Sequence, residues 1–138
     1  MSGEISLRVL LGSMRPDLVP GVFVFVTLAA GIPVPPGIDP VMSFREREGR
    51  TLIVAEHEAR AAGLPATFRC RMITLNIHSA LEAVGFLAAI LPALAAASMG
   101  VNPVSAFYHD HLFVPVDRAD DAMAILEQIA DQHTPLRR

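Results

Sequence analysis

The stretch from Met72 to Val101, MITLNIHSALEAVGFLAAILPALAAASMGV, decides the fold. Its first part alternates between apolar and polar residues, with Ile73 and Leu75 on one face, which predicts the end of a strand that begins at Thr67. A long apolar segment follows, from Ala83 to Val101, and predicts a helix. A strand that runs into an apolar helix is the opening of a crossover unit, so the elements that come next determine the architecture.

The residues after this helix complete one folding unit. Asn102–Tyr108 and His111–Val116 have the composition of a hairpin, and Asp117–Asp131 carries an apolar stripe at helical spacing. The order strand, helix, strand, strand, helix is that of a ferredoxin-like split βαβ unit without its last strand. Its right-handed crossover leaves a gap between the first two strands, which the third strand fills in antiparallel orientation.

The first part of the chain shares part of this order, which is a weak internal repeat of elements. We predict a helix over Ile5–Met14, a strand over Gly21–Leu28, a loop over Ala29–Pro40, a hairpin over Met42–Val54 and a helix over Ala55–Ala62. Leu64 and Pro65 mark the joint between the halves, so we divide the chain into domains 1–65 and 66–138. The fold class that these elements predict is α+β.

The apolar segment is long enough to span a membrane, and its nineteen residues carry no charge. Only seven of them are Leu, Ile, Phe or Val, and Pro92 interrupts the run. The segment also lacks the flanking Trp, Lys or Arg residues that anchor membrane helices. We therefore expect a buried helix and no membrane partner, with one face on the sheet and the other on a second helix or subunit.

Composition argues against several classes of function. The net charge is −3 and the chain has no lysine, which makes nucleic acid a poor partner. Cys70 is the single cysteine and no secretory leader opens the sequence, so we expect a reducing cytoplasm. No nucleophile stands at the spacing of a base, and no phosphate-cradling glycine loop appears, so we expect neither an enzyme nor a cofactor.

Polar and ionisable side chains are concentrated in two segments, which the predicted strand order brings to one edge of the sheet. They are the junction His78–Glu82 and the turn His109–His111. A helix start presents free backbone N–H groups and about half a positive charge, which suits a carboxylate. Glu82 or Asp110 would then meet an ammonium group. Alternatively, Ser79 and Glu82 have the spacing of a capping box and serve the helix alone.

The histidines support a metal site as a further alternative. His78, His109 and His111 would together bind zinc, copper or nickel, because neutral imidazole ligates these metals. A turn at Asp110 would break the alignment of the last two rings. In that case the histidines form hydrogen bonds to carbonyl groups and solvent.

The segment Arg45–Glu48 alternates in charge, which is typical of a solvated hairpin edge.

Three strings carry a resemblance to a known family: FREREGRTLIV at 44–54, HSALEAVG at 78–85 and YHDHLFVP at 108–115. From Ile5 to Ile129 the chain resembles the small bacterial tandem ACT-domain proteins of unknown function. Those proteins are in turn similar to the amino-terminal half of the eukaryotic CASTOR arginine sensors. The resemblance implies two ACT-like, ferredoxin-like half-domains in tandem, with antiparallel sheets and helices on one face. It also implies a regulatory role through a small ligand, commonly an amino acid.

The same resemblance implies where the ligand lies. ACT modules usually hold it in the loop after the first strand and at the start of the helix, against a neighbouring module. By motif position, the ligand-binding residues are His78, Ser79, Ala80, Leu81 and Glu82. The predicted strand order adds His109, Asp110 and His111 at the turn. The resemblance also favours Arg45 or Glu46 as residues that face the site across the joint between the halves. Ala80 stands where these relatives often carry a serine, so one hydroxyl for hydrogen bonding is missing.

Three functions follow as hypotheses. The first is a regulatory sensor module that binds an amino acid or similar small zwitterion and works as a homodimer. The second is a metal-binding protein that uses the three histidines. The third is a structural domain in which the apolar helix mediates oligomerisation.

Overall fold

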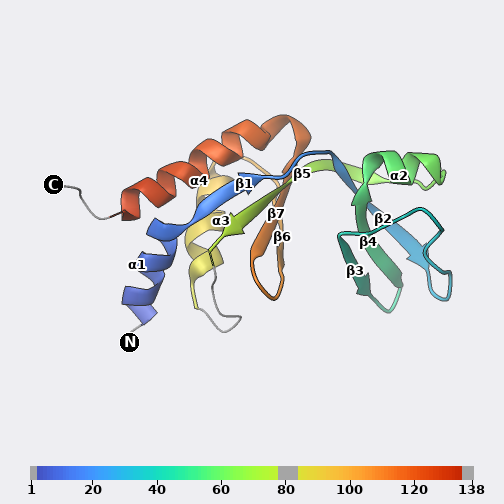
Figure 1. Cartoon of the computed structure of the whole chain (residues 1–138), viewed down its shortest axis with the longest axis horizontal. Coiled ribbons are helices and arrows are strands. Elements are labelled where there is room, and N and C mark those ends of the chain that lie inside the picture. Colours follow the sequence, from blue (N-terminus) through green and yellow to red (C-terminus); the bar gives the residue numbers. More distant parts are fainter. Residues whose placement is uncertain (1–2, 78–83, 135–138) are drawn as a thin grey trace. The chain divides into compact units, whose positions relative to one another are not determined.

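The computed structural model describes residues 3–77 and 84–134, and the chain forms two compact units. We call Pro20–Arg71 the inserted unit, and Met1–Val19 together with Met72–Arg138 the outer unit. The helices (Figure 1) are α1 (Gly3–Ser13), α2 (Glu56–Ala61), α3 (Phe86–Ala96) and α4 (Ala119–His133), with a 3-10 turn at Val116–Arg118. The strands are β1 (Arg15–Leu18), β2 (Phe23–Ala29), β3 (Met42–Arg45), β4 (Gly49–Ala55), β5 (Thr67–Asn76), β6 (Asn102–Ser105) and β7 (Asp110–Pro115). The fold is α+β with antiparallel strand pairs, as predicted.

The inserted unit is a sheet with the order β3-β4-β2-β5, in which β5 takes part through its first half. β2 and β4 pair over their full lengths, from Phe23 opposite Ala55 to Ala29 opposite Gly49. Residues 30–41 form neither helix nor strand, which confirms the predicted loop. One face of the sheet packs against α2 and this loop through a small apolar core: Val24, Val26, Leu28, Leu52, Val54 and Ala59, with Val34, Ile38 and Leu64 at its border.

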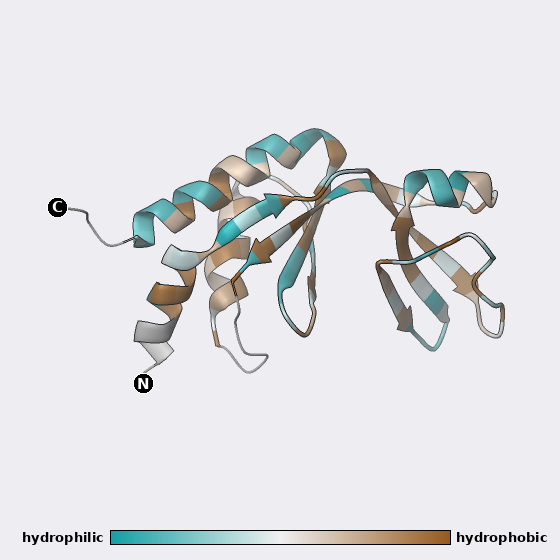
Figure 2. Cartoon of the chain, viewed as in Figure 1, coloured by the Kyte–Doolittle hydropathy of each residue, from teal (hydrophilic) through white to brown (hydrophobic). Residues whose placement is uncertain are grey.

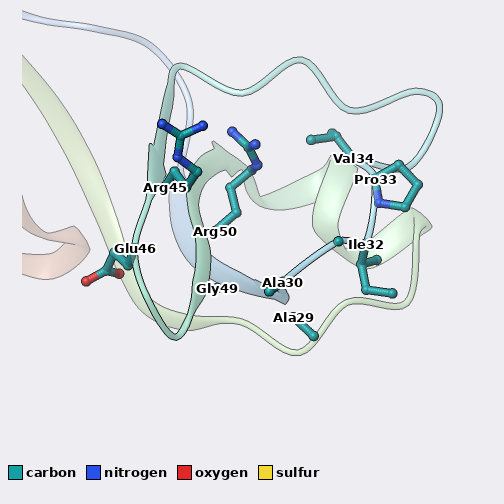
Figure 3. Close-up of a pocket in the computed structure, with 10 residues that line it drawn as sticks. Ala29, Ala30, Ile32, Pro33, Val34, Arg45, Glu46, Gly49 and Arg50 are labelled. Carbon is teal, nitrogen blue, oxygen red and sulfur yellow. The ribbon is translucent and has the colours of Figure 1, made fainter.

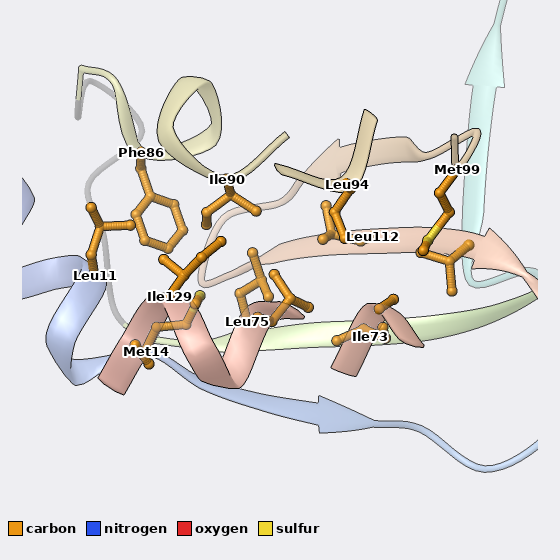
Figure 4. Packing of buried hydrophobic residues seen from close by; sticks show 14 of the residues in the cluster. Leu11, Met14, Ile73, Leu75, Phe86, Ile90, Leu94, Met99, Leu112 and Ile129 are labelled. Atoms are coloured by element: carbon orange, nitrogen blue, oxygen red, sulfur yellow. The ribbon is translucent and has the colours of Figure 1, made fainter. Parts of the chain in front are cut away.

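The outer unit has the strand order β1-β5-β7-β6, with β5 taking part through its second half. β7 lies between β5 and β6, as the crossover argument predicts. Helices α1 and α3 both contact α4 and cover one face of the sheet. Figure 4 shows the core between these layers; its largest fully buried members are Met14, Ile73, Leu75, Ile90, Leu94, Leu112 and Leu126.

Strand β1 is the element that the sequence analysis missed. Its residues Arg15 to Leu18 pair antiparallel with Asn76 to Ile73 of β5. In the inserted unit, the last strand of the repeat is β5, and it pairs with the first strand, β2. In the outer unit, β5 is itself the first strand of the repeat, and β1 takes the position of the last strand beside it. A charged tetrapeptide that contains proline carries no strand signal, and proline is tolerated only at a sheet edge. Because of this exchange, the compact units combine segments that are distant in the sequence, and the division of the sequence into 1–65 and 66–138 stays a prediction.

The repeat extends to single residues. Residues 51–60 and 111–120 have the same order of buried, half-buried and exposed positions, with Leu52 at the place of Leu112 and Ala59 at that of Ala119. The two hairpin turns also have equal lengths, because Arg45 pairs with Arg50 and Ser105 pairs with Asp110. Positions in one unit can therefore be compared with positions in the other.

Helix α3 is buried along one side, as predicted, and starts later in the sequence than predicted. Phe86, Ile90 and Leu94 point into the core, and none of the described helices is long and apolar enough to cross a membrane. Figure 2 shows the apolar colouring of this helix. The helix begins at Phe86 because Gly85 adopts a left-handed conformation with φ 89°. The predicted start near Leu81, with Ser79 and Glu82 as its capping box, is therefore wrong for this helix.

Replacing Met14 by alanine should lower the free energy of unfolding by about 2–5 kcal/mol, because the fully buried side chain would leave a cavity. The matched control is Val9→Ala in α1, where the side chain is 56% exposed, and its effect should stay below about 0.5 kcal/mol. Urea unfolding monitored by circular dichroism measures both. Equal, small losses in the two variants would contradict the place of Met14 in the core.

Candidate functional site

The turn between β6 and β7 lies beside the end of β5. The Nδ1 atom of His109 is 3.3 Å from the carbonyl oxygen of Ile77, although 32 positions separate the two residues. This contact agrees with the strand order on which the predicted site depends. The segment His78–Glu82 continues directly from Ile77 but lies outside the described residues, so the roles of His78, Ser79, Ala80, Leu81 and Glu82 stay a prediction.

His111 lies on the sheet face that points away from the helices. Its neighbour Leu112 is buried in the helix-covered core, and successive residues of a strand face opposite sides. The Nδ1 atom of His111 is 2.9 Å from the hydroxyl of Thr74 on β5. Burial lowers the pKa of His111 below its ordinary value, the positive charge of His109 lowers it further, and Asp110 opposes this shift. The imidazole is therefore held in its neutral form near neutral pH.

Asp110 begins β7 and is already engaged within its own hairpin. Its Oδ1 accepts a hydrogen bond from the hydroxyl of Ser105, the residue directly opposite on β6. This bond fixes the carboxylate at the edge where the predicted ligand ammonium group would lie. Its role toward a ligand stays a prediction.

The rings of His109 and His111 are neighbours, with centroids 6.4 Å apart and planes at 81°. The turn at Asp110 therefore keeps the two imidazoles close together, with their planes nearly perpendicular. Within residues 3–77 and 84–134, no group of three His, Cys, Asp or Glu side chains is arranged to hold a metal ion. His78, the proposed third ligand, falls outside these ranges, so the metal hypothesis is neither supported nor tested by them.

Cys70 lies on β5 in a closed environment. Its Sγ is 3.3 Å from the carbonyl oxygen of Phe23, and burial raises the pKa of the thiol to about 12. Because the thiolate is the reactive form of cysteine, this residue is chemically inert as a nucleophile.

Arg45 and Glu46 belong to the inserted unit, where both line a cavity of about 400 Å³ (Figure 3). Its walls are the segment 29–34, which begins at the last residue of β2, and the β3–β4 hairpin, including Gly49 and Arg50 at the start of β4. The sequence analysis did not single out Arg50 or this segment. The sequence did contain a signal for this segment. Val26-Thr27-Leu28 aligns with Ile73-Thr74-Leu75, and this alignment puts Gly31 at the position that His78 has in the other repeat.

Stability should fall more steeply on acidification in the native protein than in a His111→Gln variant. His111 has a folded-state pKa below its unfolded value of about 6.5, so the unfolded state binds more protons once the pH drops through that value. The stability that neutral His111 contributes is therefore complete above about pH 6.5 and is lost progressively below it. Melting temperatures between about pH 8 and pH 5 measure the difference. Parallel curves for the two proteins would contradict it.

Comparisons with known proteins agree on one family. A family model described as ACT domain matches residues 2–71, and a second model with the same description matches residues 67–128. The search of curated proteins gave no match.

Among solved structures, a Vibrio cholerae protein of unknown function, described as a possible transport protein, is 39% identical with a TM-score of 0.83, covering 94% of this chain and 99% of that chain. An Agrobacterium tumefaciens protein is 16% identical with a TM-score of 0.72, covering 85% and 89%. The ligand-free regulatory subunit of aspartate kinase from Thermus thermophilus is 14% identical with a TM-score of 0.64, covering 85% and 96%, which is a likeness of fold. The chain belongs to the ACT-domain family and carries two ACT domains in tandem.

Proposed function

We propose that this protein is a regulatory module that binds an amino acid or similar small zwitterion and signals its presence to a partner protein in the cytoplasm. ACT domains are regulatory modules that generally bind small molecules, and the fold is shared with regulatory subunits of aspartate kinase rather than with a catalytic domain. The inert thiol of Cys70 supports a role without catalysis.

The observation that carries the proposal is the contact of His109 with the carbonyl group of Ile77. It brings the β6–β7 turn to the point where the chain leaves β5 and enters the segment His78–Glu82. In this proposal, that segment binds the ligand carboxylate. Asp110 and Glu82 bind the ammonium group, as charge-assisted hydrogen bonds favour.

A thermal-shift screen against the twenty amino acids at millimolar concentration tests the proposal. A ligand present at about 100 times its Kd stabilises the folded protein by about 2.7 kcal/mol, which raises the melting temperature by several degrees. Asp110→Asn should weaken binding of the hit by about tenfold, since it removes a charge and keeps the shape. Asp120→Asn, on the exposed side of α4, is the matched control. The proposal fails if no amino acid stabilises the protein.

We further propose that the module is a homodimer. Five residues of α3 are exposed, and all of them are small or apolar: Ala88, Ala89, Pro92, Ala95 and Ala96. A surface of this kind allows the close approach of a second apolar surface. Light scattering should therefore give twice the chain mass of 14.8 kDa, and Ala89→Arg should return the mass to that of the monomer. A monomeric mass for the unaltered protein would contradict the dimer.

A further inference from the structure

The cavity of the inserted unit occupies the place that corresponds, in the repeat, to the site proposed in the outer unit. Between the first two strands of the outer unit stands α3, whereas the same interval of the inserted unit, residues 30–41, contains no helix. The segment 29–34 therefore faces the β3–β4 turn across open space of about 400 Å³. Cavities of about 300–1,000 Å³ are typical of small-molecule sites.

Two arginines stand at this cavity on the same face of the hairpin. Arg45 and Arg50 are directly opposite each other in the register of β3 and β4, and directly opposite residues of antiparallel strands project to one side. Figure 3 shows both guanidinium groups extending from the hairpin in the same direction. Like charges in this arrangement repel each other, so the pair is unfavourable unless a negative charge lies between them.

No carboxylate in the described part of the chain neutralises the pair. Arg50 donates from Nη1 to the hydroxyl of Ser43 at 3.0 Å, which leaves its charge uncompensated, and neither arginine belongs to an ion pair among residues 3–77 and 84–134. Glu46, the nearest acid in the sequence, instead accepts a hydrogen bond from the hydroxyl of Thr51. Thr51 follows Arg50 in the strand and so faces the other side, and Figure 3 shows Glu46 turned away from the arginines.

The other repeat shows that the fold does not require this charge. The residues equivalent to Arg45 and Arg50 are Ser105 and Asp110, which hydrogen-bond to each other. In one hairpin the two cross-strand residues thus bind each other, and in the other they are two cations without a carboxylate partner among the residues that the structure describes. The difference lies in side-chain chemistry on the same backbone arrangement.

We infer that Arg45 and Arg50 form a second binding site, specific for the oxyanion group of a small molecule, a carboxylate or a phosphate. Guanidinium groups bind both through paired, charge-assisted hydrogen bonds. Ile32, Pro33 and Val34 form the opposite wall, which suits a short apolar body attached to the anion. The site belongs to the inserted unit and does not depend on the amino-acid site proposed for the outer unit.

Titration of the full-length protein with inorganic phosphate and, separately, with succinate tests this inference by ¹⁵N NMR. Sodium chloride keeps the ionic strength constant, because screening alone changes the affinity of exposed charges. We expect saturable shifts at residues 29–34 with at least one of the two anions, and the preferred anion identifies the chemical group. Absence of saturable shifts with both anions at tens of millimolar would overturn the inference.

Variants separate a defined site from general attraction of anions. Arg45→Gln and Arg50→Gln should each raise the Kd by about tenfold or more. Arg47→Gln is the matched control, because Arg47 is an exposed residue of the same turn that does not line the cavity, and its Kd should stay within about twofold. Equal losses in all three variants would show nonspecific binding and overturn the inference.

Melting temperatures give an independent readout. Without added anion, Arg45→Gln should melt at a higher temperature than the unaltered protein, because it removes the repulsion within the pair. With the preferred anion, this order should reverse, since only the unaltered protein gains from binding. A variant that melts lower than the unaltered protein under both conditions would contradict the repulsion argument.

Discussion

The antiparallel pairing of β1 with the second half of β5 is the interaction on which the outer unit depends. Arg15 lies opposite Asn76, so the ladder joins parts of the chain about sixty residues apart. It covers an edge of β5 that would otherwise expose a row of unpaired N–H and C=O groups. It also anchors the preceding helix, whose Leu11 packs in the same core as Met14. The N-terminal segment is thus part of the second ACT domain in space, although it comes first in the sequence.

Much of this architecture could be predicted because it follows from local periodicity. The alternation around Ile73 and Leu75, the glycine at the turn of the first hairpin and the amphipathic stripe after Asp117 each predict their elements within a few residues. The position of β7 followed from the handedness of the crossover. The exceptions have physical causes. Strand β1 is held by a distant partner rather than by its own propensity, and α3 starts late because Gly85 takes a conformation that the pattern does not reveal.

The candidate sites were predictable only in part. The approach of the β6–β7 turn to the end of β5 follows from strand order, and the contact of His109 with Ile77 bears it out. The cavity beside Arg50 does not follow from any motif, because it arises where a helix is lacking and where a register sets two arginines opposite each other. The two hairpins have turns of equal length but carry side chains of different charge. The fold alone therefore does not determine what either unit binds.

Strand β5 supplies its first half to one unit and its second half to the other, without an intervening loop. Duplicated domains are usually separable, since each copy keeps all of its own strands. Here a cut ahead of Thr67 would remove β5 from the upstream fragment, which would leave β1 without its partner and β2 with β4 alone, and the downstream fragment would have a bare sheet edge. Each ACT domain therefore relies on a strand from the other half of the sequence, so we expect the two domains to fold only as a pair.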